Sequence, residues 1–294
     1  MDRALLLALM VVLFSFQSLF TRLYSKSYAG VDKSAATPVF SVCYGLFIAL
    51  CSWVAGGFGF HASWQTWLFG LLNALILLLY NTSMIKSGNL GSYAFLMLSS
   101  LFGGIVIPLI AGTAFLGERM SLLKWTAAAL MLAAVLLMNS KGLTLKNAAR
   151  GYFFWCALLF LANGLYGTVM NFQVRNLNGQ EGSEMRVILF AFSALLAFLA
   201  EALQGRGRKL IGGFAMGKKA GLWLAACCVS AFAAVRLLMY LLSKMQTGIV
   251  HTINNGGVLV LSLLYAIVLF GEKPNRLQYL GMALAAASIV MLSL

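Results

Sequence analysis

The sequence predicts an all-α integral membrane protein in which ten transmembrane helices form two inverted five-helix repeats around a central cavity. Three observations support this fold class. The 294 residues are 62% hydrophobic and only 10% charged, whereas a soluble domain carries about 25% charged residues. The apolar residues fall into ten runs, each long enough to cross a bilayer. One short motif also occurs twice, together with the helices on either side of it.

The ten runs follow one another with short connections. A spanning helix needs about 20 mostly apolar residues. The predicted segments are residues 4–24, 36–56, 65–86, 90–116, 121–139, 151–174, 184–204, 219–243, 246–270 and 276–294. The first run has neither a basic leader nor a small-residue cleavage site, so we expect a retained helix. The longest connection, residues 205–218, is basic, and we expect it to be a solvated cytoplasmic loop.

The repeated motif is a Gly-Glu pair followed by a basic residue. It occupies Leu116–Arg119 and again Phe270–Lys273, 154 residues later. The segments 4–24 and 151–174 align at an offset of 146, which pairs Gln17 with Asn163. These matches indicate a duplicated half-protein.

We divide the chain into a first repeat, residues 1–140, and a second repeat, residues 141–294. Five helices is an odd number, so the two repeats must cross the membrane in opposite orientations. Inverted repeats of this kind place a transporter's binding site at the repeat interface, near the middle of the bilayer.

The net charge of +14 is explained by membrane orientation. The connections on one side of the predicted membrane hold 14 Lys and Arg residues and those on the other side hold six. Because basic loops stay in the cytoplasm, this bias places both termini outside. No basic stripe or soluble domain is present to bind nucleic acid, so we expect no nucleic-acid partner.

Ten helices, two inverted halves and a Gly-Glu-basic turn after the fourth helix of each half resemble the drug/metabolite transporter superfamily, of the EamA type. The resemblance covers nearly the whole chain. It implies a carrier that works by alternating access, with the first four helices of each half around the cavity and the fifth at the periphery or between subunits. It implies no particular substrate. Ten-helix members generally have both termini in the cytoplasm, the reverse of the orientation that the charge bias predicts.

Polar residues inside the membrane are the candidate site, because polar groups are costly in hydrocarbon. Segment 246–270 has the strongest set, which shares one helical face: His251, Asn254 and Asn255. Gly256 and Gly257 follow directly, and Ser100 aligns with Asn254 in the other half. Glycine-interrupted segments in matching positions favour a cavity lining. Close helix packing is the alternative, and His251 could instead cap the start of its helix.

Arg236 lies inside segment 219–243, one turn before Tyr240. A guanidinium stays charged at all relevant pH values, so it needs a partner. Arg236 either pairs with Glu201 or faces the cavity, where a substrate carboxylate or phosphate would meet it. The second alternative predicts a carboxylate-bearing or zwitterionic substrate.

The remaining candidates for the lining are spread over three segments, with helix packing as the alternative in each case: Gln17, Tyr80, Asn81, Asn163 and Tyr166. Glu118 and Glu272 each follow a glycine at a helix end. There a carboxylate can cap N–H groups or pair with nearby cations such as Arg119. We favour this structural role over proton coupling, because neither residue reaches the middle of the membrane.

These features predict a secondary transporter that moves a small polar organic metabolite across the plasma (inner) membrane. The alternative is a polyspecific exporter of drugs and amines. Small multidrug members carry a carboxylate in their first helix, whereas Ala4–Tyr24 contains none. No nucleophile–base pair, metal-ligand cluster or phosphate-binding glycine loop indicates an enzyme. We expect no cofactor and no metal. The expected partners are a small-molecule substrate and the lipid bilayer, with a coupling proton or an exchanged metabolite, in a monomer or homodimer.

Overall fold

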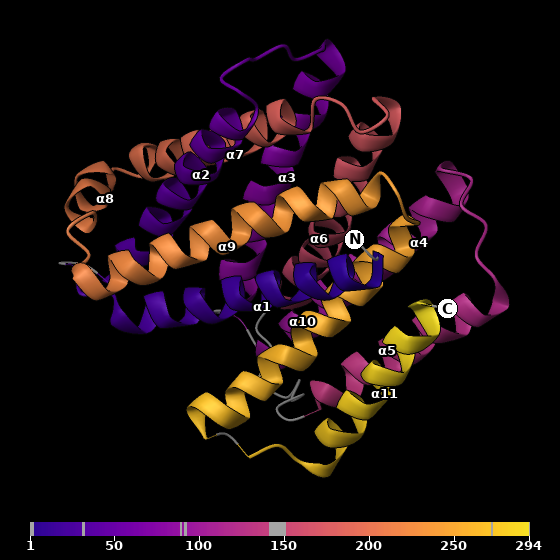
Figure 1. Ribbon diagram of the computed structural model, residues 1–294. Helices are drawn as coiled ribbons and strands as arrows, with labels where there is room; N and C mark the ends of the chain where they lie inside the picture. The colour runs from indigo at the N-terminus through magenta and orange to yellow at the C-terminus, as the bar shows by residue number, and fades with distance from the viewer. Residues whose placement is uncertain are drawn as a thin grey trace.

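The computed structural model describes residues 3–30, 33–88, 90, 93–140, 151–271 and 273–293. Glu272 therefore lies outside the described residues. Within them the chain forms α-helices and one short 3-10 helix, without a strand. In order they are α1 (Arg3–Ser27), η1 (Lys33–Ala35), α2 (Ala36–Ala55), α3 (Trp64–Gly88), α4 (Tyr93–Phe115), α5 (Leu122–Met138), α6 (Tyr152–Asn176), α7 (Gly182–Leu203), α8 (Gly207–Gly213), α9 (Lys218–Leu242), α10 (Thr247–Phe270) and α11 (Arg276–Ser293) (Figure 1).

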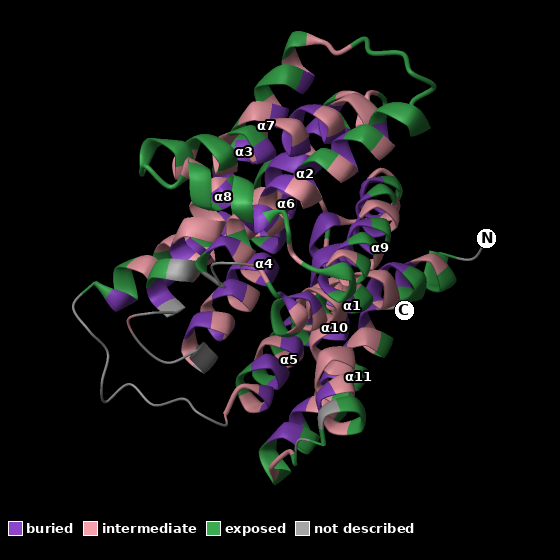
Figure 2. Ribbon diagram, turned by 90° about the vertical axis from the view of Figure 1, so that its left-hand side faces the viewer, coloured by how far each residue is buried: buried purple, intermediate pink, exposed green. Residues whose placement is uncertain are grey.

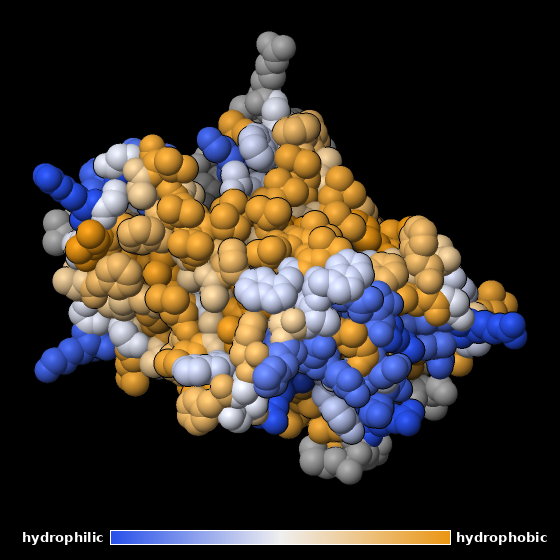
Figure 3. Space-filling view, turned by 90° about the horizontal axis from the view of Figure 1, so that it is seen from above, coloured by the Kyte–Doolittle hydropathy of each residue, from blue (hydrophilic) through white to orange (hydrophobic). Residues whose placement is uncertain are grey.

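All ten predicted segments form helices. Eight of the helices in the described part are long and apolar enough to cross a membrane, and α5 and α11 are apolar but shorter. Large apolar side chains cover the outside, including Phe115, Leu122 and Val268, each more than 70% exposed. Seen from above, a broad hydrophobic surface has hydrophilic side chains gathered at its edges (Figure 3). A soluble monomer rarely exposes such a surface, so the chain has the character of an integral membrane protein.

The duplicated glycines end their helices in the same way. Gly117, after α4, has φ of 64°, and Gly271, after α10, has φ of 65°. A side chain at either position would meet no neighbouring atom. The left-handed backbone, which favours glycine at a helix C-terminus, therefore explains the repeated residue.

The helices form one bundle in which the two halves of the sequence interleave. α1 of the first half packs against α9 and α10 of the second half. In the same way, α6 of the second half packs against α3 and α4 of the first half. α2 packs against α7, and α4 against α10. α5 and α11 lie side by side at one edge, next to α10 (Figure 1). Buried residues follow the facing sides of the helices, and exposed residues cover the ends and outer faces (Figure 2).

The basic connection at residues 205–218 is mostly exposed, as expected, but it is not a simple loop. It contains α8, whose Leu210 is only 1% exposed. The hydroxyl of Tyr28 donates to the carbonyl oxygen of Gly213 (2.9 Å), and the N–H of Ala29 donates to Met216. In the sequence, the apolar pair Leu210 and Ile211 is the signal for this short helix. In the structure Leu210 is buried and Ile211 is exposed.

Candidate functional site

A cavity of about 410 Å³ lies among α1, α2, α3, α4, α6, α7, α9 and α10. Its volume is in the range of small-molecule sites. The polar lining consists only of amides and hydroxyls: Gln17, Ser18, Tyr44, Tyr80, Ser100, Asn163, Tyr166, Asn254, Asn255 and Ser262. No charged side chain is among the described lining residues. The cavity is therefore polar but electrically neutral.

Seven of the eleven predicted site residues line this cavity: Gln17, Tyr80, Ser100, Asn163, Tyr166, Asn254 and Asn255. Four others do not line it. Asn81 lines a separate pocket between α2, α3 and α7. His251 is 6% exposed, and its ring lies against Gly167 of α6. It occupies the α10 turn before Asn255 and does not cap the helix, which begins at Thr247.

Asn255 joins α10 to α4 at the wall of the cavity. Its Nδ2 donates to the carbonyl oxygen of Gly104 (2.9 Å) and to that of His251 (2.9 Å). In a regular helix the Gly104 carbonyl would accept from the N–H of residue 108. That residue is Pro108, which has no N–H. The amide of Asn255 therefore satisfies a carbonyl that the proline leaves free, as buried backbone in a membrane requires.

Asn163 makes the corresponding contact from α6. Its Nδ2 donates to the carbonyl oxygen of Ser100 (2.7 Å), one turn before Gly104 on α4. Both wall amides are thus partly committed to the backbone of α4. Their remaining surface and the Ser100 side chain border the cavity.

Two acceptors in the lining have no partner among the described residues. Gln17 donates through Nε2 to the hydroxyl of Tyr44 (2.9 Å), but its Oε1 is buried and accepts nothing. The Oδ1 of Asn254 is also buried without a partner. Buried polar atoms normally find a hydrogen bond, so these two lining side chains retain unused acceptor capacity.

The glycines of α4 and α10 do not interrupt their helices, so the expectation of glycine-interrupted segments was wrong. Both helices run continuously through Gly103, Gly256 and Gly257. A side chain at Gly103 would overlap the carbonyl oxygen of Phe160, and one at Gly257 would contact Val11. These glycines allow close helix packing, which was the alternative interpretation.

Arg236 and Tyr240 lie on the outer face of α9, so neither faces the cavity. Val235 and Leu238 are buried beside Arg236, which is itself exposed. Arg236 precedes the end of α9 at Leu242 by six residues, about 9 Å. A flexible arginine can reach the membrane surface over that distance. Tyr240 lies one turn nearer to the end of the helix, a position typical of a tyrosine at the membrane interface.

The alternative pairing of Arg236 with Glu201 was also wrong. Arg236 is close enough to Arg186 to repel it electrostatically. Arg186 lies in the first turns of α7, and Glu201 follows it by 15 residues in the same helix, about 22 Å. Whether Arg236 faces the cavity depends on the rotation of α9 about its axis, and its distance from Glu201 depends on the direction in which α7 runs. The residue pattern around Arg236 alone determines neither.

Glu118 is bound in a cluster with Asn171, Arg175 and Thr247, which we call the Glu118 cluster. Its Oε1 accepts from the backbone N–H of Thr247 (2.8 Å), from the hydroxyl of Thr247 (2.6 Å) and from Nη2 of Arg175 (3.1 Å). Asn171 Nδ2 donates to the same hydroxyl. The expected capping role is confirmed, but the capped helix is α10 and the cation is Arg175 of α6.

The sequence argument missed Tyr44 as a lining residue and missed the contacts of Arg175 and Thr247 with Glu118. Tyr44 follows Thr37 and Ser41 at helical spacing, a polar face that the sequence argument did not use. Its place in the bundle shows that it borders the cavity. Arg175 and Thr247 are at helix ends that are 72 residues apart in the sequence. Their meeting with Glu118 depends on how α6 and α10 pack.

Residues 150–294 match the model of the EamA-like transporter family. A search of curated proteins gives no match. Among solved structures, 29 chains match. One crystal structure superposes with a TM-score of 0.72 and 16% sequence identity, over 99% of this chain and 98% of that chain. At this identity the likeness shows the fold alone, and it extends over the whole helical arrangement.

Proposed function

We propose that the chain is a secondary transporter that moves a small polar organic metabolite through the central cavity. Residues 150–294 match the EamA-like transporter family, which belongs to the drug/metabolite transporter superfamily. The chain resides in the plasma membrane, with the lipid bilayer as its surroundings. The neutral, amide-rich cavity between the two halves carries this proposal.

The proposal includes ten membrane crossings in two inverted repeats. α5 and α11 are the two shorter helices, and they pack against each other at corresponding places in the two halves. The packing of α1 on α9 corresponds to that of α6 on α3 when the halves are exchanged. The matching backbone of Gly117 and Gly271 gives independent support.

The lining favours a substrate without net charge, which includes zwitterions. A single ion moved from water into this cavity would lose hydration and meet no opposite charge among the described lining residues. Amide and hydroxyl groups instead suit a solute with several hydrogen-bonding groups. With Arg236 on the outer face, the argument for a carboxylate preference no longer holds. The exporter of cationic drugs is the less favoured alternative, because no carboxylate is among the described residues that line the cavity.

Alternating access requires one end of the cavity to close. The Glu118 cluster joins the α4–α5 connection, the end of α6 and the start of α10. From there α10 passes His251 and reaches the cavity at Asn254, and its lining residues continue away from the cluster to Ser262. We therefore place a closed gate at the Glu118 cluster, with access from the opposite end.

A ligand screen tests the substrate class. The purified protein is heated with size-matched solutes that are neutral or zwitterionic, anionic, or cationic. A ligand at 100 times its Kd raises the free energy of unfolding by about 2.7 kcal/mol. We expect stabilisation by neutral or zwitterionic polar solutes. Asn254→Leu should abolish it, while Asn139→Leu, an equivalent change outside the cavity and outside the pocket of Asn81, should preserve it. Stabilisation by cations alone would contradict the proposal.

Transport itself needs a second measurement. The stabilising solute is loaded as a radiolabel into proteoliposomes, and we expect exchange that Asn254→Leu slows. Binding without exchange would show a receptor or sensor instead of a carrier.

A further inference from the structure

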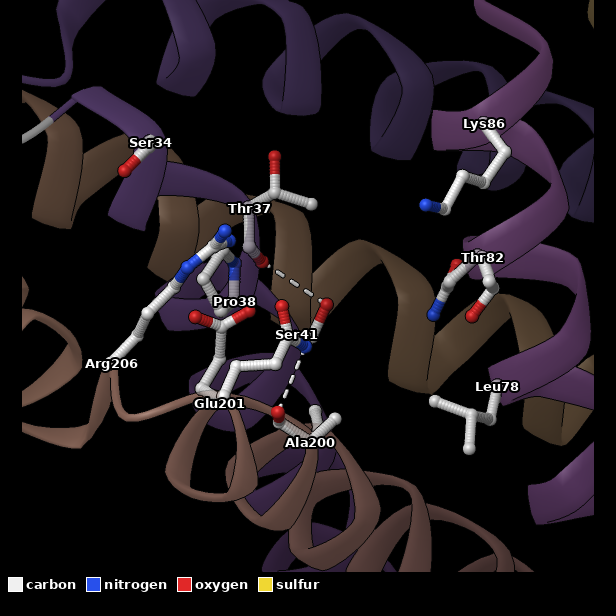
Figure 4. A pocket seen from close by; sticks show the side chains of 13 residues that line it. Ser34, Thr37, Pro38, Ser41, Leu78, Thr82, Lys86, Ala200, Glu201 and Arg206 are labelled. Carbon is white, nitrogen blue, oxygen red and sulfur yellow. Dashed lines mark hydrogen bonds between the residues drawn. The ribbon is translucent and has the colours of Figure 1, made fainter.

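A second polar pocket, of about 520 Å³, lies between α2, α3 and α7 at the end of the bundle where η1 and α8 begin. It shares no lining residue with the central cavity. In the close view, Thr37, Ser41 and Glu201 form one side and Thr82 and Lys86 of α3 the other (Figure 4). Leu78, Pro38 and Ala197 supply apolar surface.

The pocket contains one carboxylate and two cations that do not neutralise each other. Glu201 is half-buried, yet no ion pair within 4 Å joins it to Lys86 or Arg206, and in the described residues its side chain has no hydrogen-bond partner. Lys86 extends from α3 toward the α2 side, across the pocket from Glu201 (Figure 4). Charges of both signs are thus available to a ligand.

Among the described carboxylates, Glu118 and Glu181 are satisfied internally, whereas Glu201, like Glu184, is not. Glu118 accepts three hydrogen bonds in its cluster. Glu181 accepts from the N–H and the hydroxyl of Ser63, both at 2.8 Å. Glu201 has hydroxyl groups and cations around it but forms no hydrogen bond or ion pair with them. It therefore retains its full capacity to bind a donor from outside.

We infer that this pocket binds a zwitterionic group, with its ammonium at Glu201 and its anionic oxygens at Lys86 and Arg206. A simple anion would pair with the two basic residues but leave Glu201 unpaired, and a simple cation would do the reverse. Only a molecule that carries both charges satisfies both sides. The hydroxyl groups of Thr37, Ser41 and Thr82 can complete the hydrogen bonding. The ligand is either a free small zwitterion or the headgroup of a zwitterionic phospholipid.

Phosphoethanolamine and ethyl phosphate are the probes, because they differ by the ammonium group alone. Each is titrated calorimetrically into the purified full-length protein. We expect phosphoethanolamine to bind about threefold to fivefold more tightly, the range for a partly solvated charge pair. Glu201→Gln should remove this difference, and Lys86→Gln should weaken both probes. Glu184→Gln and Lys218→Gln, equivalent changes outside the pocket, should change neither.

A second arm identifies the source of the ligand. Native mass spectrometry compares retention of phosphatidylethanolamine with that of phosphatidylglycerol, in the parent protein and in Glu201→Gln. Selective retention lost in Glu201→Gln assigns the site to a lipid headgroup, and a Glu201-dependent response to the soluble probe alone assigns it to a free zwitterion. Both support the inference. Equal affinity for the two soluble probes together with unselective lipid retention would overturn it, as would selectivity that survives Glu201→Gln.

Discussion

The side-chain amide of Asn255 replaces the backbone N–H that Pro108 lacks, because its Nδ2 donates to the carbonyl oxygen of Gly104 at 2.9 Å. The proline lies in the first half of the sequence, and the amide that compensates for its missing N–H lies in the second half. The same side chain borders the central cavity. Asn255 therefore has a structural role that Asn254, its neighbour in the lining, does not share.

Asn255→Leu should destabilise the protein by about 1–3 kcal/mol, because the buried Gly104 carbonyl loses its partner. Asn254→Leu should cost less. Adding Pro108→Ala to Asn255→Leu should recover part of the loss, since the new N–H can bond to Gly104 within α4. Unfolding of the purified variants by heat or denaturant measures these differences. A double variant as unstable as Asn255→Leu alone would show that the Gly104 carbonyl is not the cause.

Arg236→Gln should leave ligand affinity and charge preference unchanged, because the side chain lies on the outer face of α9. Ligand-induced thermal shifts in Arg236→Gln and in the parent protein provide the comparison. Since Arg236 has no ion pair with Glu201, adding Glu201→Gln should have no compensating effect on stability. A selective loss of anion binding in Arg236→Gln would return this residue to the site.

Glu118→Ala should cost about 1–2 kcal/mol, because the first N–H of α10 loses its capping acceptor. Glu118→Gln keeps an acceptor and loses only the charge opposite Arg175, whose side chain is 38% exposed. That change should cost less than about 1 kcal/mol. Denaturant unfolding distinguishes the two variants.

The same pair of variants tests the closed gate. In a protein without its native cysteines, Asn254→Cys is exposed to an impermeant maleimide added on the Glu118 side of the membrane. We expect faster labelling in the presence of Glu118→Ala than in the parent, with Glu118→Gln between them. Equal rates in all three would mean that the cluster supports the helices without closing the cavity.

Glu181 should make stability depend on acid pH. Burial raises the pKa of its carboxyl, but hydrogen bonds from Thr66 and Ser63 outweigh this effect and hold the pKa below its ordinary value of 4.5. The contribution is therefore complete above about pH 4.5 and is lost as the pH falls through the lowered pKa.

Glu181→Gln should be less stable than the parent at pH 6, by less than about 1 kcal/mol because the group is near the surface. The difference should shrink on acidification toward pH 3.5. Thermal melting over this range measures it. A difference that stays constant with pH would assign the contact to neutral hydrogen bonding.

The orientation of the chain follows from the distribution of its basic residues. With 14 Lys and Arg residues on one side and six on the other, both termini should face outward. A cysteine added after Leu294 should react with an impermeant reagent in intact cells. Reaction only after lysis would establish the opposite orientation, as the family resemblance implies.

Much of the fold could be predicted from the sequence, because apolar runs and a bilayer's thickness together define helices. The boundaries of α6 and α10 lie within a few residues of the predicted segments. The polar faces of α10 and α6 were also found, because an amide among apolar residues is conspicuous. The short helix α8 escaped, since its seven residues carry only a weak apolar signal.

The side chains' directions were harder to predict. Arg236 and Asn255 are both polar residues within apolar helices, yet one faces outward and the other faces the bundle. The difference depends on the rotation of each helix about its axis, which neighbouring helices determine. Glu201 was considered only as a partner for Arg236, and its place beside Lys86 depends on the approach of α7 to α3.

The interleaved packing of α1 on α9 and α2 on α7 has a consequence for biosynthesis. The ribosome delivers α1 to α5 to the membrane before any of their main partners exists. These helices must remain solvated by lipid, free to diffuse, until the second half has been inserted. Final assembly is then a docking of two preinserted sets, so the two halves expressed as separate polypeptides should associate into the same bundle.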